Sequence, residues 1–396
     1  MNTTFTCASG TWQLQRWPLN QPNGSLQAWD AADELLIAHT LEAATQFGDR
    51  NSRKPMLLLI NDSFGALSCA LSDYPQVQVN DSWLAELASR HNRAQNQLDN
   101  SHFQQQSSLA AYPDKPDIVL LKLPNNHSYL QYILQQLAQV VSSQTLILAS
   151  AKAKDISRNV LARFNSTLGP ASASLTVKKC RLIQCQFDPA LTRQLESFPL
   201  QWTLEQSQFT LFNHANVFSR EKLDQGARFF LQHLPTLQDG QTIVDLGCGN
   251  GVLALSLLSQ TKESQTTESQ AKTVSLWCYD ESYMAVESAK LSIGHNLPQQ
   301  LSQCHFVVDD CLTRHSDNSC DWVLCNPPFH QQQAITSHVA SQMFIDAKRV
   351  LKPGGRLRIV ANRHLAYQDS LKRLFGNCRQ LAADPKFVIL ETIKRS

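Results

Sequence analysis

Short apolar runs that end in polar residues recur along both halves of the chain, and this recurrence most constrains the fold. In the first half the runs cover residues 56–60, 77–79, 118–121 and 145–149, with helix-like segments between them. A short continuous apolar run is typical of a strand buried on both faces, and strands that alternate with helices form a parallel sheet. The first half therefore predicts an α/β domain.

The second half repeats this pattern at similar spacing. Residues 243–245 correspond to 60–61, 279–282 to 80–82, 321–324 to 117–120, and 358–363 to 147–152. The spacings agree once the polar stretch 261–273, interpreted as a surface loop, is set aside. An internal duplication explains the agreement, and two unrelated domains of one common fold class are the alternative.

Length and composition fit two α/β domains. A chain of 396 residues, 42% hydrophobic and 17% charged, has room for two cores. We expect two tandem Rossmann-like domains, residues 1–195 and 196–396, with a hairpin at about residues 202–212 opening the second. The sequence has no apolar run near the roughly 18 residues of a membrane span, and the first residues lack a signal-peptide pattern. A cytoplasmic protein without a membrane partner is therefore expected.

Cysteine spacing and charge add weaker constraints. The eleven cysteines form no Cys-x-x-Cys pair, which favours buried free thiols over disulfides or metal ligands, so no metal is expected. The net charge of +2 does not by itself indicate a nucleic-acid partner. Basic residues are nevertheless concentrated, with seven against one acid in residues 151–181 and twelve against three in residues 348–396. Solvated faces explain such stretches as well as RNA contacts do.

A glycine-rich loop lies between a predicted strand and a predicted helix at residues 245–251, Asp-Leu-Gly-Cys-Gly-Asn-Gly. Gly247, Gly249 and Gly251 allow a tight turn and close approach of a ligand to the backbone. A dinucleotide fingerprint would require glycine where Val252 stands, which disfavours a nicotinamide cofactor.

Acidic residues follow three successive predicted strands: Asp245, Asp280 and Asp310, with Asp309 as the less favoured neighbour of the last. Asp245 can hold the amino group of a methionine moiety, since a carboxylate suits a cationic ligand. Asp280 can accept both hydroxyls of a ribose, and Asp310 can accept from an adenine amine. Each acid alone could simply cap a helix. Together with the glycine loop they predict an S-adenosylmethionine site.

A second loop, Asn326-Pro327-Pro328-Phe329, ends the apolar run 322–325. Prolines cannot donate to a sheet ladder, so the strand stops there and the loop is rigid. The Asn326 side chain and the Pro327 carbonyl can accept the two hydrogens of an exocyclic amine while Phe329 stacks on its ring. A Pro-Pro turn without function is the simpler alternative. With the cofactor loop beside it, this loop predicts methylation of a planar amine.

These motifs resemble those of class I S-adenosylmethionine-dependent methyltransferases, and more narrowly the ribosomal RNA guanine-N2 methyltransferases with a duplicated methyltransferase domain. The resemblance implies a seven-stranded catalytic sheet whose last strand, near residues 386–390, is antiparallel. It also implies a degenerate amino-terminal copy that binds no cofactor and helps to hold RNA. Residues 213–228, which include Phe218, resemble the segment that helps to close the cofactor pocket. Residues 57–71, 149–155 and 360–365 are most similar to members that modify large-subunit rRNA.

The expected reaction is methylation of a guanine N2 amine in 23S rRNA that is protein-free or incompletely assembled, since a target inside a helix must first be unstacked. The same chemistry on 16S rRNA is the main alternative. The Asn-Pro-Pro-aromatic loop also fits adenine N6 in DNA or a glutamine amide. A non-catalytic RNA-binding assembly factor and a nicotinamide oxidoreductase remain as alternatives of other classes.

Overall fold

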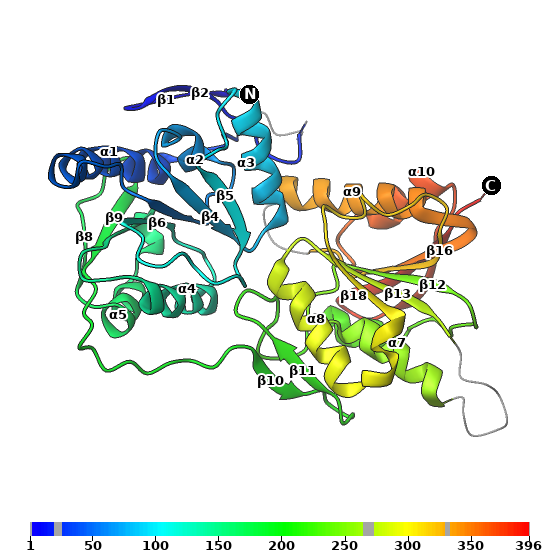
Figure 1. The fold of residues 1–396 in the computed structure, drawn as a ribbon. Helices are drawn as coiled ribbons and strands as arrows, with labels where there is room; N and C mark the ends of the chain where they lie inside the picture. The colour runs from blue at the N-terminus through cyan, green and yellow to red at the C-terminus, as the bar shows by residue number, and fades with distance from the viewer. Residues whose placement is uncertain (1, 20–25, 264–272, 329–332, 396) are drawn as a thin grey trace. The chain divides into compact units, whose positions relative to one another are not determined.

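The protein is described by a computed structural model that covers residues 2–19, 26–263, 273–328 and 333–395, without the side chains of residues 262–263 and 333–337. The chain divides into two compact units, Met1–Phe198 and Pro199–Ser396, called unit 1 and unit 2 below. Each unit is a sheet covered by helices (Figure 1).

Unit 1 opens with a two-stranded hairpin and continues as alternating strands and helices. Its strands are β1 (Thr4–Cys7), β2 (Gly10–Gln13), β3 (Leu57–Ile60), β4 (Gln76–Asn80), β5 (Phe103–Ser107), β6 (Ile118–Lys122), β7 (Leu146–Lys152), β8 (Ala171–Ala173) and β9 (Cys180–Cys185). Its helices are α1 (Ala31–Asn51), α2 (Ala66–Ala70), α3 (Trp83–Gln95), α4 (His127–Val140), η1 (Ala153–Asp155) and α5 (Arg158–Thr167).

Unit 2 has the same plan. Its strands are β10 (Leu200–Thr203), β11 (Thr210–Asn213), β12 (Thr242–Leu246), β13 (Ser275–Asp280), β14 (Cys304–Val308), β15 (Cys320–Cys325), β16 (Leu351–Asn362), β17 (Arg379–Ala383) and β18 (Phe387–Ile393). Its helices are α6 (Gln225–Leu231), α7 (Val252–Glu263), α8 (Tyr283–Asn296), η3 (Pro298–Gln303), α9 (Gln333–Val350) and α10 (Tyr367–Phe375).

The two central sheets have seven strands each and identical topology. Their orders are β5-β4-β3-β6-β7-β9-β8 in unit 1 and β14-β13-β12-β15-β16-β18-β17 in unit 2. Six strands of each sheet run in the same direction, whereas β9 and β18 run antiparallel to both neighbours. The fold class of two tandem Rossmann-like domains is confirmed. The antiparallel last strand expected near residues 386–390 is β18.

The central sheet of unit 2 buries both faces because alternate side chains of its parallel strands point to opposite sides. Ile243 of β12 packs with the helices α6, α7 and α8, and the next residue, Val244, packs with α9 and α10. Figure 1 shows α7 and α8 on one face of the sheet and α9 and α10 on the other. Burial on both sides explains why the strands appear as uninterrupted apolar runs in the sequence.

Sequence patterning missed the edges of the unit 1 sheet. Strand β5 has the polar sequence Phe-Gln-Gln-Gln-Ser and carries no apolar run, and the β8–β9 hairpin was not expected at all. The hairpin expected at the start of unit 2 is present as β10 and β11. Ser82 caps α3, accepting from the backbone of Ala85 at 3.3 Å.

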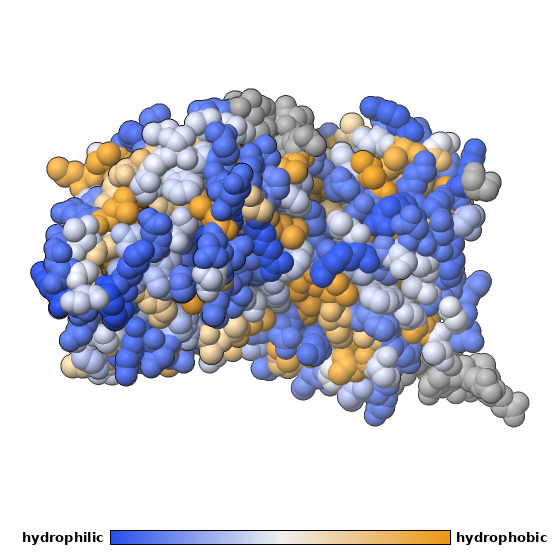
Figure 2. Space-filling model, turned by 45° about the horizontal axis from the view of Figure 1, so that its top comes forward, coloured by the Kyte–Doolittle hydropathy of each residue, from blue (hydrophilic) through white to orange (hydrophobic). Residues whose placement is uncertain are grey.

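The surface in the view of Figure 2 is mainly hydrophilic, with hydrophobic residues in scattered patches. No helix in the described part of the chain has the length and apolar character needed to span a bilayer.

Candidate active site

In the sheet of unit 2 the strand order reverses between β12 and β15. β12 lies between β13 and β15, so the loops that leave β12 and β15 turn toward opposite faces. Open α/β sheets bind ligands beyond the carboxyl ends of their strands at such a point. All the described site residues predicted from the sequence, apart from Phe218, lie at or just beyond the ends of β12, β13, β14 or β15.

Asp245 lies at the end of β12 and is fully buried, with 0% of its surface exposed. One carboxylate oxygen accepts from the backbone N–H of Ala254 in α7 at 3.2 Å, and no described residue forms a hydrogen bond with the other oxygen. Burial raises the pKa of Asp245 to about 7, and the nearby charge of Asp280 adds to this effect. A cation beside the orphaned oxygen would satisfy it and favour the ionised form.

The three glycines of the loop serve different purposes. Gly249 has φ +53°, and a Cβ at this position would meet no atom within 4 Å, so the space beside it is open. At Gly251 a Cβ would lie 2.8 Å from the Cα of Ala289 in α8, and its φ is +78°. Gly251 thus permits close packing of α8, whereas Gly249 leaves room for a ligand. A Cβ on Gly247 would come within 4.0 Å of the Asn326 carbonyl oxygen.

Asp280 ties the glycine loop to the neighbouring strand. Its carboxylate oxygens accept from the backbone of Gly249 at 3.0 Å and of Ser282 at 3.1 Å. Each carboxylate oxygen can accept more than one hydrogen bond, and the side chain is only half-buried. The residue can therefore hold the loop and still accept from a ligand hydroxyl.

Asp309 and Asp310 follow β14 and have different environments. Asp309 is buried and bonded to Arg314, with a 3.0 Å contact to its Nε, which commits it to the turn. Asp310 is half-buried. Asp310 is thus the more exposed of the two carboxylates, and its contact with a ligand stays a prediction.

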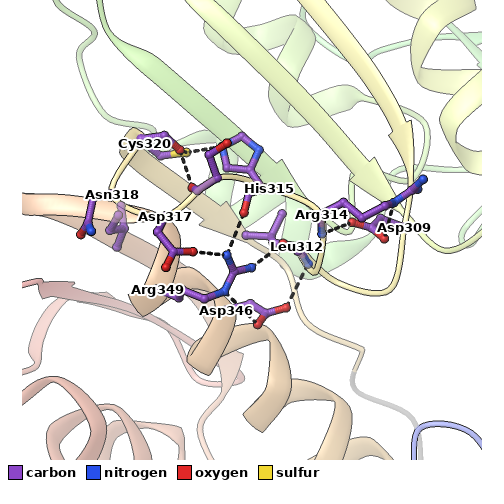
Figure 3. Close-up of polar contacts among 12 residues, drawn as sticks. Asp309, Leu312, Arg314, His315, Asp317, Asn318, Cys320, Asp346 and Arg349 are labelled. Carbon is purple, nitrogen blue, oxygen red and sulfur yellow. Dashed lines mark hydrogen bonds and ion pairs between the residues drawn. The ribbon is translucent and has the colours of Figure 1, made fainter.

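The segment after Asp310 is fixed to α9 (Figure 3). Arg349 of α9 donates to the carbonyl oxygens of Leu312 at 2.6 Å and His315 at 2.7 Å. Asp346, one turn earlier in α9, accepts from the backbone of Leu312 at 3.1 Å. These bonds hold the segment that follows β14 against α9.

Asn326 lies directly after β15 and is half-buried. Its side-chain nitrogen is 3.4 Å from a carboxylate oxygen of Asp224, and its side-chain oxygen is buried without a hydrogen-bond partner among the described residues. An unpaired buried carbonyl oxygen costs stability, so this oxygen beside the glycine loop is a candidate binding group. An amide oxygen in this position can accept a hydrogen bond from a ligand donor.

The remaining predicted site residues are described by their exposure. Pro327 is buried and Pro328 is exposed, while Phe329 lies outside the described residues. Phe218, between β11 and α6, is 54% exposed. The contacts described above join Gly249 to Asp280 and bring Asn326 next to the glycine loop.

Asp224 is a site residue that the sequence reasoning did not single out. It caps α6 by accepting from the backbone of Ala227 at 2.9 Å, and the same oxygen faces Asn326. An acid before a helix has a local explanation as an N-cap, so no sequence pattern connects it with a loop about a hundred residues later. Only the fold brings the two together.

Unit 1 differs from unit 2 at the position that matches Asn326. Leu121 pairs with Ile60 as Cys325 pairs with Leu246, so Lys122 occupies the position of Asn326. The ammonium group of Lys122 contacts Asp30 at 2.7 Å and Asp33 at 2.8 Å. Asp30 caps α1 as Asp224 caps α6. An internal ion pair therefore occupies the place of the substrate acceptor.

The glycine loop is also changed in unit 1. Gly65 keeps the close packing of Gly251, since a Cβ there would lie 2.8 Å from the Cα of Ser89. The strand register aligns Ile60 with Leu246, which corrects the match of residues 60–61 with 243–245 expected from the sequence. Asn61 and Ser63 therefore stand where unit 2 has Gly247 and Gly249. The structural glycine is retained and the ligand-facing one is lost, which makes unit 1 a degenerate copy.

Comparison with known families assigns each unit separately. Residues 2–189 match the family described as RLMG N-terminal domain, and residues 208–391 match the methyltransferase small domain. A solved structure of a T. thermophilus 16S rRNA N2 methyltransferase, in complex with AdoMet and guanosine, shares the fold with a TM-score of 0.73. It is 18% identical, and the similarity covers 99% of this chain and 98% of the other. Fold and site together define a methyltransferase of the class I topology.

Two curated relatives resolve the family further. A protein of Pseudoalteromonas translucida (strain TAC 125), called ribosomal RNA large subunit methyltransferase G, is 45% identical over 98% of this chain and 97% of its own length. A protein of the same name from Klebsiella pneumoniae (strain 342) is 44% identical over 96% of both chains. The chain belongs to the family of ribosomal RNA large subunit methyltransferase G.

Proposed function

We propose that the protein transfers the methyl group of S-adenosylmethionine to the exocyclic N2 amine of a guanine in 23S rRNA. The observation that carries this proposal is the Asn326 side-chain oxygen, which is buried, has no hydrogen-bond partner among the described residues and lies beside the glycine loop. The names of the curated relatives support the large-subunit substrate. The T. thermophilus N2 methyltransferase, solved with AdoMet and guanosine, supports the base and the amine.

The cofactor would lie along the carboxyl ends of β12, β13 and β14. Asp245 would pair with its amino group, Asp280 with the ribose hydroxyls and Asp310 with the adenine amine. The open space at Gly249 fits a ligand that runs past the backbone of the loop, and the orphaned Asp245 oxygen fits a cationic group. Phe218 is assigned to the rim of this pocket. When bound, S-adenosylmethionine supplies an electrophilic methyl group on a sulfonium.

The target amine would be held by Asn326 and Pro327. The guanine N2 lone pair is delocalised into the ring, so the free amine is a weak nucleophile. Hydrogen bonds from the amine to the Asn326 side-chain oxygen and the Pro327 carbonyl favour a more tetrahedral nitrogen and align it with the methyl group. No base is needed before transfer, since the amine is neutral and its methylated cation is acidic. Pro328 keeps the loop rigid, and Phe329 is assigned to stacking on the base.

Asp224 would orient the Asn326 amide in this arrangement. A carboxylate oxygen can only accept, so the 3.4 Å contact places the amide nitrogen toward Asp224 and turns the amide oxygen away from it. The oxygen is then aimed at the substrate before binding. We assign Asp224 as a positioning residue.

Unit 1 is assigned to RNA binding and to scaffolding, with protein-free or incompletely assembled rRNA as the substrate in the cytoplasm. A single-stranded or loosely paired target is reached without the cost of unstacking, which is a few kcal/mol in a duplex.

The proposal is tested with labelled S-adenosylmethionine and separate protein-free large-subunit and small-subunit rRNA from a strain that lacks the enzyme. Nucleoside analysis should find labelled N2-methylguanosine in large-subunit RNA only. Label in small-subunit RNA would move the substrate assignment to 16S rRNA. Absence of label from both would reject the proposed reaction.

A further inference from the structure

We propose that the side chain of Asn362 identifies the target base as guanine by accepting a hydrogen bond from its ring N1–H. The inference rests on the proposed function and deepens it, because Asn326 and Pro327 are assigned there to the N2 amine alone. Other bases also carry an exocyclic amine, so contacts with the amine do not by themselves select guanine. Guanine has a second donor beside the amine, N1–H, whereas adenine has an acceptor at N1. Enzymes that act on an extruded base read such differences along its Watson–Crick edge.

Asn362 is the last residue of β16, which lies beside β15 in the sheet of unit 2. Cys325 of β15 and Ile359 of β16 are register partners, so β16 extends three residues past the level at which β15 ends. Asn362 therefore lies beyond the carboxyl end of β15, at the level of the loop that begins with Asn326. Open α/β sheets bind their ligands at this edge.

The side chains of Asn326 and Asn362 point to the same face of the sheet. Successive residues of a strand face opposite sides, so a residue shares its face with the residue two positions earlier. Those earlier residues, Leu324 and Val360, both pack in the core formed with α6, α7 and α8. The 3.4 Å contact of Asn326 with Asp224, which caps α6, agrees with this direction.

The start of α6 extends from one asparagine to the other. Its N-cap residue faces Asn326, and the next residue, Gln225, accepts from the ammonium group of Lys386 at 2.8 Å. Lys386 directly precedes Phe387, the register partner of Asn362 in β18. Extending the register of β15 and β16 by one residue places the two asparagine Cα atoms about 8 Å apart, from strand spacing and rise. Side chains at this separation can converge on one base.

Asn326 and Asn362 each carry a buried side-chain oxygen that accepts no hydrogen bond from any residue that the structure describes. Both residues are otherwise only half-buried. Buried acceptors without a partner are rare because they cost stability. Two of them on the same face of neighbouring strands suit a ligand with two adjacent donors. The N2 amine and N1–H of guanine are such a pair.

Unit 1 has lost both amide oxygens. Its strand register matches Ala149 with Ile359, one residue away from the match expected from the sequence, so Lys152 occupies the position of Asn362. A lysine likewise replaces the target-loop asparagine. An ammonium group cannot accept a hydrogen bond. The copy without the ligand-facing glycine therefore also lacks both acceptors, as expected if the two asparagines act on one substrate.

The test uses the full-length protein and a synthetic large-subunit rRNA fragment in which the guanine labelled by the wild type has been located. A second fragment carries 2-aminopurine at that position, which keeps the N2 amine but has neither N1–H nor O6. Asn362→Leu removes the acceptor at similar size, and Asn362→Asp keeps an acceptor oxygen. Asn51→Leu is the control, since Asn51 is an exposed residue at the end of α1. For each protein kcat/KM on both fragments, affinity for S-adenosylmethionine and Tm are measured.

The wild type should methylate guanine about 10- to 10²-fold more efficiently than 2-aminopurine, the range for one hydrogen bond to a base edge. Asn362→Leu should lower kcat/KM for guanine by the same factor and leave the value for 2-aminopurine unchanged. Its affinity for S-adenosylmethionine and its Tm should also stay the same. Asn362→Asp should restore the preference for guanine, because a carboxylate accepts from N1–H. Asn51→Leu should match the wild type.

An equal loss on both fragments would overturn the proposal, because Asn362 would then support the fold or hold the amine. An unchanged preference in Asn362→Leu would overturn it as well. So would a failure of Asn362→Asp to restore the preference, since a carboxylate cannot donate to O6 and the contact would then lie there. If the wild type methylates no guanine, the proposed function fails and this inference with it. If guanine is methylated and the preference does not depend on residue 362, only the inference fails.

Discussion

Replacement of Asn326 by alanine separates catalysis from stability. The variant loses the buried side-chain oxygen proposed to accept from the substrate amine. Loss of one preorganised transition-state hydrogen bond lowers kcat by about 10²- to 10³-fold, or about 2.7–4 kcal/mol. The expected effect on affinity for S-adenosylmethionine is small, because the predicted cofactor contacts lie on other strands.

The same substitution should leave the fold intact. The Asn326 oxygen is unsatisfied, and removing such a group relieves a penalty of about 1–3 kcal/mol, while the 3.4 Å contact with Asp224 contributes little. We expect a Tm that is unchanged or about 2–4 °C higher, because a gain of about 1 kcal/mol in the free energy of unfolding raises Tm by that amount in a domain of the size of unit 2. Single-turnover methyl transfer, cofactor titration and thermal unfolding measure the three quantities.

Asn125→Ala is the matched control, since Asn125 is an exposed asparagine in the equivalent loop of unit 1. Its methyl transfer should equal that of the wild type. A normal kcat in Asn326→Ala would refute the proposed role of the amide oxygen. So would a loss of activity that comes with an equal loss of cofactor affinity and a fall in Tm.

Three further substitutions or titrations test the same geometry. Affinity for S-adenosylmethionine should fall about tenfold per pH unit below pH 7, since burial raises the pKa of Asp245 to about 7 and a bound cation favours its ionised form. Ligand titration of the wild type and of Asp245→Asn at several pH values tests this prediction. An equally steep pH dependence in the variant would contradict it. Gly251→Ala should lower the free energy of unfolding of unit 2 by about 3 kcal/mol, because the added methyl group would contact Ala289. Gly249→Ala should lower it by about 1 kcal/mol but should weaken cofactor binding. Denaturant unfolding and ligand titration measure the two effects. Asp224→Ser should keep the α6 cap but release Asn326, which should lower kcat about tenfold with little change in Tm. If Asp224→Asn restores kcat, Asp224 acts by positioning Asn326 and not through its charge.

Sequence patterning was informative where burial imposes a simple pattern. Strands β3, β6, β12 and β15 are covered on both faces, so their apolar runs indicated them directly. The polar strand β5 lies at the sheet edge and left no such signal. The glycine loop and the Asn-Pro-Pro loop were recognisable because backbone conformation restricts which residues can stand there.

Other features of the site depend on long-range contacts that a linear pattern does not contain. The sequence shows three equivalent-looking glycines, and only the position of Ala289 distinguishes Gly251 from Gly249. Likewise, the N-cap role of Asp224 is local, whereas its contact with Asn326 depends on the packing of α6 against the sheet. The ion pair of Lys122 in unit 1 has the same origin.

Asn326 is proposed to hold the N2 amine of a guanine in large-subunit rRNA for methylation. The most direct measurement of this role is transfer of labelled methyl groups by the wild type and Asn326→Ala to protein-free large-subunit rRNA, followed by nucleoside analysis. We predict labelled N2-methylguanosine with the wild type and at least about 10²-fold slower labelling with the variant. Label in another nucleoside, or equal rates for the two proteins, would contradict this role.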